Sequence, residues 1–146
     1  MIRVATIDDL EGVLNLYKEL RPSDPDLDVS FAQDKWAEII NDPQTQIVVA
    51  EINGELASTC ALGINKSIAN GARPFAIIEH VITSSKFRRQ GLSGRVLEFA
   101  ISLAWENNCC KVMLLSGAQL KGAHSVYESV GFKSGIETGF VIKPSV

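Results

Sequence analysis

The stretch from Phe75 to Gly94 constrains the fold of this chain more than any other. It begins as a run of apolar and β-branched residues typical of a buried strand, passes through a polar linker, and ends in a glycine-containing turn before a long helical pattern. Free backbone N–H groups and the positive end of a helix dipole meet at such a turn. Gly91 and Gly94 let an anion approach the backbone, and Arg88 and Arg89 add positive charge. The stretch therefore predicts a site for a phosphate group.

The glycine spacing distinguishes between phosphate-binding motifs. A Walker loop requires G-x-x-x-x-G-K-[ST], and no lysine follows Gly94, while a dinucleotide fingerprint requires G-x-G-x-x-G. The chain instead fits R-x-x-G-x-[GA], with Arg88 first, Gly91 fourth and Ser93 last, where Gly or Ala is usual. Preceded by an apolar strand and Phe87, this pattern resembles the coenzyme A pyrophosphate loop of the GNAT superfamily of N-acetyltransferases.

Length and composition predict one globular domain. The 146 residues suffice for a sizeable core, and 46% hydrophobic with 21% charged residues is ordinary for a soluble protein. The formal charge of −3 argues against a nucleic-acid partner, and no apolar run reaches the roughly 18 residues of a membrane span. Three cysteines, two of them adjacent, form neither a disulfide framework nor a zinc site. With no visible signal peptide, we expect a cytoplasmic protein without a metal.

The remaining patterns predict alternating strands and helices. Thr6 to Asp9 matches a capping box before a helix over 8–20, and Ser30 with Gln33 predicts the start of a second helix, ended by 41–43. Asn53-Gly54 predicts a type I′ turn between two strands. The predicted strands are 2–5, 46–52, 55–64, 75–83 and 111–116, with last strand material in 132–142; the two later helices are 91–107 and 123–130.

This order of elements predicts a mixed sheet with helices on both faces, and it is also the order of the GNAT fold. Two further runs match the superfamily: Ile2-Arg3-x-Ala5-x-x-x-Asp9 at the start, and 123–132, which fits A-x-x-x-Y-E-x-x-G-F. The resemblance covers nearly the whole chain. It implies an α/β (α+β) protein of the three-layer GNAT type, with a mixed, mostly antiparallel central sheet and a single N-acetyltransferase domain over 1–146.

The resemblance further implies that acetyl-CoA is the cofactor. In the family, the sheet splays beside the central strand, and free backbone groups there bind the pantetheine arm; the matching positions are Val81, Ile82 and Thr83, one of whose N–H groups would act as the oxyanion donor. The helix dipole disfavours two arginines at the start of a helix unless an anion is bound there. The presence of Arg88 and Arg89 at this position therefore also favours a bound ligand. The residues expected at the pyrophosphate are Arg88, Arg89, Gln90, Gly91, Leu92, Ser93 and Gly94.

Tyr127 is the candidate catalytic acid. A phenol with a pKa near 10 stays protonated at neutral pH and can donate a proton to a leaving thiolate. The resemblance places Tyr127 at the matching position, facing the cofactor. The alternative is an aromatic core residue at helical spacing with Ala123 and Val130.

Glu79 is the candidate base, acting directly or through a water. A carboxylate in a central strand is costly to bury unless it is paired or used. Glucosamine-phosphate and aminoalkylphosphonate acetyltransferases of the family carry a similar Ile-Glu-x-[IV] run. The competing base is His80, which alternation places on the opposite face of the sheet. The alternative for both residues is a structural ion pair or hydrogen bond inside the mixed sheet.

The sequence leaves several classes of molecule open as the acceptor of the acetyl group. Acidic residues of one loop could attract a cationic amine, basic residues could hold a phosphate, phosphonate or carboxylate, and both sets could be solvated surface charge. These sets are Asp24, Asp26 and Asp28, and Arg21, Lys66 and Arg73. The main hypothesis is a small-molecule primary amine; the alternatives are a protein lysine or N-terminal amine, or a non-catalytic acyl-CoA-binding module. The resemblance also implies a possible homodimer.

Overall fold

A computed structural model describes residues 1–145 of the chain. In these residues the strands are β1 (Ile2–Val4), β2 (Thr45–Ile52), β3 (Glu55–Asn65), β4 (Phe75–Thr83) and β5 (Val112–Leu114). The helices are α1 (Leu10–Leu20), α2 (Val29–Ile40), the short α3 (Ala69–Ala72), α4 (Leu92–Glu106) and α5 (Lys121–Ser129), with 3-10 turns η1 (Ile7–Asp9) and η2 (Ser85–Phe87).

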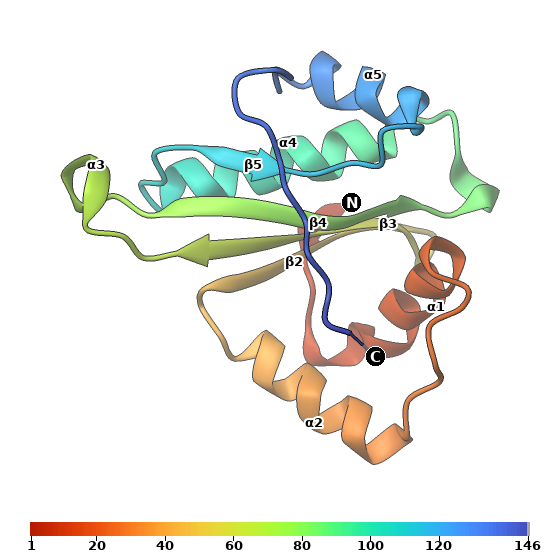
Figure 1. Ribbon diagram of the computed structural model, residues 1–146. Helices are drawn as coiled ribbons and strands as arrows, with labels where there is room; N and C mark the ends of the chain where they lie inside the picture. The colour runs from red at the N-terminus through yellow and green to blue at the C-terminus, as the bar shows by residue number, and fades with distance from the viewer. Residues whose placement is uncertain (146) are drawn as a thin grey trace.

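The strands form one sheet in sequence order, β1-β2-β3-β4-β5 (Figure 1). The first three pairings are antiparallel, whereas β5 runs parallel to β4 after the crossover through α4. A parallel neighbour needs such a crossover, since a tight turn can only reverse the chain. The predicted mixed, mostly antiparallel sheet is confirmed.

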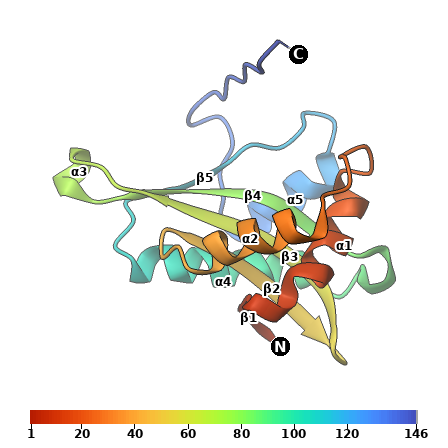
Figure 2. The same cartoon turned by 90° about the horizontal axis from the view of Figure 1, so that it is seen from below.

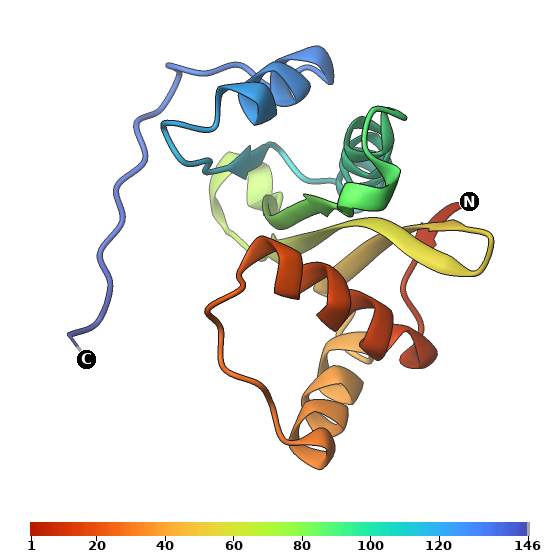
Figure 3. The same ribbon diagram turned by 90° about the vertical axis from the view of Figure 1, so that its right-hand side faces the viewer.

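Helices cover both faces of the sheet, and each face has its own apolar core (Figure 3). One core, the α1–α2 cluster, is built on the buried residues Ala5, Val13, Trp36, Ile47 and Val49. The other, the α4 cluster, joins α4 and α5 to the opposite face and includes Leu62, Ile78, Val96, Leu97 and Ala100, all at most 1% exposed. The fold is therefore three-layered, as the order of elements predicted.

Helix α1 lies unusually close to β3. A Cβ atom on Gly12 would stand 2.7 Å from Leu56 Cδ1, closer than atoms pack without displacement. Glycine at this position is what lets the helix backbone approach the strand. The spacing of α1 from the sheet is thus fixed by the absence of a side chain.

Two predicted local signals are confirmed. At the capping box, the Thr6 N–H donates to Asp9 Oδ2 at 2.7 Å, while the Thr6 hydroxyl accepts from the Asp8 N–H. At the hairpin between β2 and β3, Asn53 and Gly54 have φ angles of 50° and 81°, as a type I′ turn requires.

The predicted N-cap of the second helix, Ser30, is wrong by two residues. The N-cap of α2 is Asp28, whose carboxylate accepts the Phe31 N–H at 3.2 Å, and Ser30 instead donates its hydroxyl to that carboxylate. Aspartate and serine are equally good caps, so the two candidates could not be separated by propensity.

The predicted last strand is also wrong. The described residues after α5 contain no strand, and the segment 133–145, here called the C-terminal tail, runs as an extended chain past β5 (Figures 1 and 2). Its residues have strand-forming side chains, but a strand also requires a paired neighbour. Gly135, at a φ of 76°, turns the chain before such pairing begins. None of the helices formed by the described residues is long and apolar enough to cross a membrane.

Candidate active site

The loop before α4 has the backbone of an anion-binding turn. Arg89 and Gly91 have φ angles of 66° and 71°, and no side chain caps the first turn of α4. The left-handed backbone conformation of Arg89 costs roughly 1–2 kcal/mol of folding free energy, which the surrounding structure must offset. Arg88 and Gln90 are exposed on either side, whereas Leu92 is buried and anchors the helix start in the α4 cluster. The free N–H groups of α4 and the two arginines therefore suit a phosphate group.

Ser93 stands where the motif usually has Gly or Ala. Its side chain is part of a row of hydrogen-bonded hydroxyl groups, called here the chain of hydroxyls. Its Oγ is 2.6 Å from Thr83 Oγ1, which is 2.8 Å from Ser58 Oγ, and Ser58 donates to the Ile82 carbonyl at 3.1 Å. Because the Ser58 hydroxyl donates its proton to that carbonyl, it can only accept from Thr83. The Thr83 hydroxyl therefore donates to Ser58 Oγ, and the Ser93 hydroxyl donates to Thr83 Oγ1. The hydroxyl chain fastens the start of α4 to β4 and β3. No local sequence signal reveals it, since its members come from three elements.

A β-bulge interrupts β4. The register between β3 and β4 shifts between Thr59 and Ala61, so that Cys60 alone faces both His80 and Val81. His80 has a φ of 56°, which is uncommon for a residue with a side chain. Bulges of this kind redirect side chains and concentrate beside active sites.

The end of β4 has a free edge on the side away from β3. Parallel pairing with β5 covers only Ala76 to Ile78. The backbone of Val81, Ile82 and Thr83 thus lies beyond the point where pairing with β5 ends. These are the positions that the resemblance implies for pantetheine binding, and their placement leaves room for backbone hydrogen bonds to a ligand.

Glu79 and His80 point to the same face of the sheet. Glu79 directly opposes Ala61, which packs in the α1–α2 cluster, and the His80 ring lies 5.2 Å from the ring of Tyr17 on α1. The bulge breaks the alternation on which the prediction of opposite faces relied, and that prediction is wrong. Both side chains are exposed, so the argument from the cost of burying Glu79 does not apply.

Tyr17 lies against His80 at the bulge, a contact that the sequence did not reveal because the helical spacing of Tyr17 marked it as core. Burial raises its pKa to about 12, and the nearby Cys60 thiol adds a smaller effect. Burial and the same thiol also raise the pKa of Tyr127. Tyr17 contacts His80 of the bulge from the α1–α2 face, whereas Tyr127 packs in the α4 cluster, which contains Cys60, on the opposite face.

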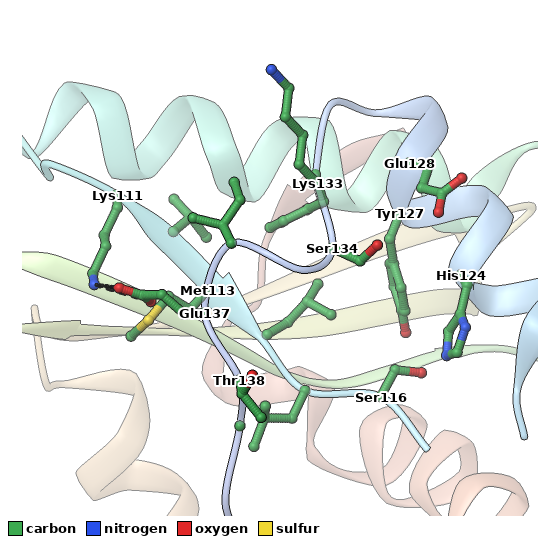
Figure 4. A pocket seen from close by; sticks show the side chains of 16 residues that line it. Lys111, Met113, Ser116, His124, Tyr127, Glu128, Lys133, Ser134, Glu137 and Thr138 are labelled. Atoms are coloured by element: carbon green, nitrogen blue, oxygen red, sulfur yellow. Dashed lines mark hydrogen bonds and ion pairs between the residues drawn. The ribbon is translucent and has the colours of Figure 1, made fainter. Parts of the chain in front are cut away.

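Tyr127 lines a cavity of about 560 Å³ between β5, α5 and the C-terminal tail. Figure 4 shows its hydroxyl directed toward Ser116 at one end of the cavity. The Tyr127 ring meets Phe132 edge-on at 6.3 Å. Ser116 Oγ is buried without a hydrogen-bond partner among residues 1–145, and it lies near Tyr127 without reaching hydrogen-bond geometry. An unpaired buried hydroxyl beside a phenol marks a place for a polar ligand atom.

Glu19 links α1 to the linker that precedes the loop. Its Oε1 accepts the Ser85 backbone N–H at 3.0 Å, and this bond lowers the pKa of the carboxyl, with a smaller contribution from Arg88. The end of α1 and the start of the phosphate loop are therefore held together by a residue that no motif singled out.

Most of the charges considered for acceptor binding have partners within the chain. Asp24 pairs with Arg21 at 2.9 Å, and Asp26 pairs with Lys18 at 3.2 Å. Asp28 caps α2, and Arg73 donates to the backbone carbonyls of 108 and 109. Among residues 1–145, five of the six charges thus have partners within the chain, whereas Lys66 is exposed and has none.

The comparisons with known proteins agree with this geometry. The model of the acetyltransferase (GNAT) family matches residues 10–132. A provisionally assigned acetyltransferase from Agrobacterium tumefaciens str. C58 is 40% identical, with 99% of each chain covered and a TM-score of 0.93. Glucosamine-6-phosphate N-acetyltransferase from Arabidopsis thaliana is 23% identical, with 99% of this chain and 97% of that chain covered and a TM-score of 0.84.

An aminoglycoside N-acetyltransferase solved in complex with CoA shares the fold at 20% identity, with 100% of this chain and 93% of that chain covered and a TM-score of 0.79. The family match covers most of the sequence, and the Agrobacterium tumefaciens structure matches the chain nearly from end to end. On these findings, the chain belongs to the acetyltransferase (GNAT) family.

Proposed function

We propose that this acetyltransferase moves an acetyl group from acetyl-CoA directly to the primary amine of a small molecule in a ternary complex. The observation that carries the proposal is the bulged end of β4. Within residues 1–145 its backbone is unpaired on the side of β5, it leads into the start of α4, and Tyr17 and Tyr127 pack on its two opposite faces.

The chain's own groups fit the cofactor. The N–H groups at the start of α4, with Arg88 and Arg89, would bind the pyrophosphate, and the free edge from Val81 to Thr83 would bind the pantetheine arm. The unpaired Ser116 hydroxyl offers one further polar contact. When bound, acetyl-CoA supplies the activated acetyl group. A backbone N–H of β4 directed at its carbonyl oxygen would lower the barrier by roughly 3 kcal/mol.

Tyr127 would hold the proton that the departing sulfur needs. Its raised pKa keeps the phenol protonated across the physiological range. On the α1 face, Glu79 would accept the proton of the incoming ammonium, directly or through water, and its exposure gives water access. His80 stands beside it as the alternative base, held against Tyr17.

Two of the relatives support a small acceptor, whereas a ribosomal-protein-alanine N-acetyltransferase from Brucella melitensis biovar Abortus 2308, which has a protein acceptor, shares the fold at 13% identity. Two proteins of the same fold are described as acetyltransferases of glucosamine 6-phosphate and of aminoglycosides, which are small amines. A protein acceptor and a non-catalytic acyl-CoA-binding role remain the competing proposals. The tests below distinguish catalysis from binding alone.

The first measurement is the melting temperature with and without acetyl-CoA. At a hundredfold excess over Kd, binding adds about 2.7 kcal/mol, which raises the midpoint by several degrees in a domain of this size. We expect Tyr127→Phe to keep this shift and lose most of its turnover with an amine acceptor, while the control Ser102→Ala, which removes an exposed hydroxyl on α4, keeps both. Turnover that survives Tyr127→Phe would remove the phenol as acid, and wild-type protein with a shift but no turnover would favour a binding role.

The base is tested by the pH profile of the rate. With Glu79 as base, Glu79→Gln flattens the dependence of kcat/KM on pH, and His80→Asn leaves the profile in place. The reverse result would assign the role to His80.

A further inference from the structure

The cavity beside Tyr127 is much larger than an acetyl group needs. Its volume of about 560 Å³ lies within the range of pockets that enclose whole small ligands. It extends along β5, with Tyr127 and Ser116 at one end and the ion pair between Lys111 and Glu137 at the other (Figure 4). An acetyl group held beside Tyr127 would occupy one end and leave the length along β5 unfilled.

Apolar side chains line this length. Val112, Leu114 and Leu115 contribute from β5 and the residue after it, while Phe132 and Ile136 contribute from the segment after α5. Leu115 is 58% exposed and Ile136 is 74% exposed, so part of this apolar surface is uncovered. Uncovered apolar surface in a concave site favours an apolar occupant, because burial removes that surface from water.

The cavity is separate from the edge of β4 that is proposed to hold the pantetheine arm. Within residues 1–145, its walls come from β5 and its flanking residues, from α5 and from the segment after it, and neither β4 nor α4 contributes. Pairing of the two strands ends at Ile78 and Leu114, so the free edge of 81–83 opens to the space beyond the end of β5. Ser116 follows that end by two residues, and the Tyr127 hydroxyl is directed toward it. A thioester on the free edge would therefore meet the cavity at this end.

We propose that the cavity holds the alkyl chain of an acyl group longer than acetyl, so that a medium-chain acyl-CoA is bound more tightly than acetyl-CoA. This rests on the proposed function, because Tyr127 marks the position of the sulfur only if it is the acid. From Leu114 to Lys111 the chain of the protein spans roughly 10 Å at ~3.3 Å per residue. A zigzag alkyl chain of about eight carbons covers that length, given C–C bonds of ~1.5 Å.

The transfer step is the same for the longer acyl group. The amine nitrogen forms a bond to the acyl carbon, the C–S bond breaks, and Tyr127 gives its proton to the departing sulfur. The ammonium loses two protons in becoming an amide. One passes through Glu79 to the solvent, and the other restores the Tyr127 phenol. The products are the amide and the free thiol, and no further reactant is needed.

Calorimetric titration with a series of acyl-CoA thioesters tests the cavity without any acceptor amine. We expect Kd to fall roughly tenfold for every two carbons added, from acetyl through butyryl and hexanoyl to octanoyl, since each methylene group buried against apolar walls strengthens binding. The gain is expected to stop beyond octanoyl, because the ion pair between Lys111 and Glu137 closes the far end.

A charge placed in the wall of the cavity tests where the chain binds. Ile136→Asp is expected to keep the wild-type Kd for acetyl-CoA and to weaken binding of hexanoyl-CoA at least tenfold. Because Ile136 is largely exposed, its replacement leaves the fold intact. The matched control is Ile142→Asp, the same change in the same tail at a residue that is 96% exposed and outside the cavity, and it should keep the whole wild-type series.

Three results would overturn the proposal: equal affinity of the wild type for acetyl-CoA and hexanoyl-CoA, a gain with chain length that persists in Ile136→Asp, or a gain that both variants lose equally. Acetyl transfer is assayed separately. A wild type that binds and transfers acetyl but gains nothing from a longer chain contradicts this inference alone. A wild type that binds neither thioester contradicts the proposed function as well.

Discussion

At the scale of single residues, Ser93 shows how a side chain larger than Gly or Ala is accommodated at the loop. Its hydroxyl is not directed at solvent but bonds to Thr83, and through it to Ser58 and the Ile82 carbonyl. Each proton in the chain of hydroxyls has an acceptor, so the arrangement is fully satisfied. Such a satisfied network stabilises one geometry, whereas a broken one leaves unpaired polar groups.

Ser93→Ala is therefore expected to lower the free energy of unfolding by about 1 kcal/mol. The matched control is Ser102→Ala on the same helix, where the exposed hydroxyl bonds only to the Glu98 carbonyl and its loss should have little effect. Urea unfolding of the two variants measures the difference. Equal stability of both variants would mean that the hydroxyl chain does not fasten α4 to the sheet.

At the scale of elements, the bulge in β4 is the feature that organises the site. One extra residue places Glu79 and His80 on the same face, and the pairing with β5 ends at Ile78, just before the bulge. The strain is concentrated at His80, where φ is 56°. Glycine adopts this conformation without cost, while other side chains lose roughly 1–2 kcal/mol.

This strain predicts a difference between two truncations. His80→Gly and His80→Ala both remove the ring from Tyr17, and only the glycine relieves the backbone. We expect the glycine variant to be more stable than the alanine variant by about 1 kcal/mol in thermal or urea unfolding. Alanine as stable as glycine would show that the bulge relaxes when the ring is absent.

The sequence predicted the elements whose signals are local. The capping box at Thr6, the Asn53-Gly54 turn and the strand–loop–helix run at 75–94 all depend on neighbours within a few residues. It missed what depends on distant partners: the bulge opposite Cys60, the place of Tyr17 in the site, and the tail, whose strand-like composition has no paired neighbour in one chain. Asp28 was missed because Ser30 is an equally good cap.

At the scale of the whole molecule, stability depends on a charge cluster that joins the first and second strands. Arg3 binds Asp9 at 2.7 Å and Glu51 at 2.6 Å, and Asp9 also accepts the Thr6 N–H. The hydrogen bond from Arg3 is the largest of the effects that lower the pKa of Asp9. Because the folded pKa lies below the ordinary value of 3.8, the carboxylate stabilises the fold above that pH, and this stabilisation is lost as pH falls through the folded pKa.

Asp9→Asn is accordingly expected to cost about 2 kcal/mol at neutral pH, since it weakens a charge-assisted bond that is only partly exposed. The difference from wild type should shrink as pH falls below about 4, where Asp9 of the unfolded chain takes up a proton, and it should vanish below the lowered pKa of the folded protein. Urea unfolding at pH 7, 5 and 3 measures it, with the exposed Asp34→Asn as control. A difference that stays constant with pH would show that the charge on Asp9 is not responsible.

The close approach of α1 at Gly12 has a consequence for how this enzyme's acceptor preference can diverge. Any side chain at Gly12 must displace either Leu56 or the helix, and Tyr17 moves with the helix. The end of α1 is also joined to the linker before α4 by the hydrogen bond from the Ser85 N–H to Glu19, so a displacement of the helix reaches both sides of the proposed site. We therefore expect a single methyl group at Gly12, far from any reacting atom, to change the affinity for the acceptor and for acetyl-CoA together.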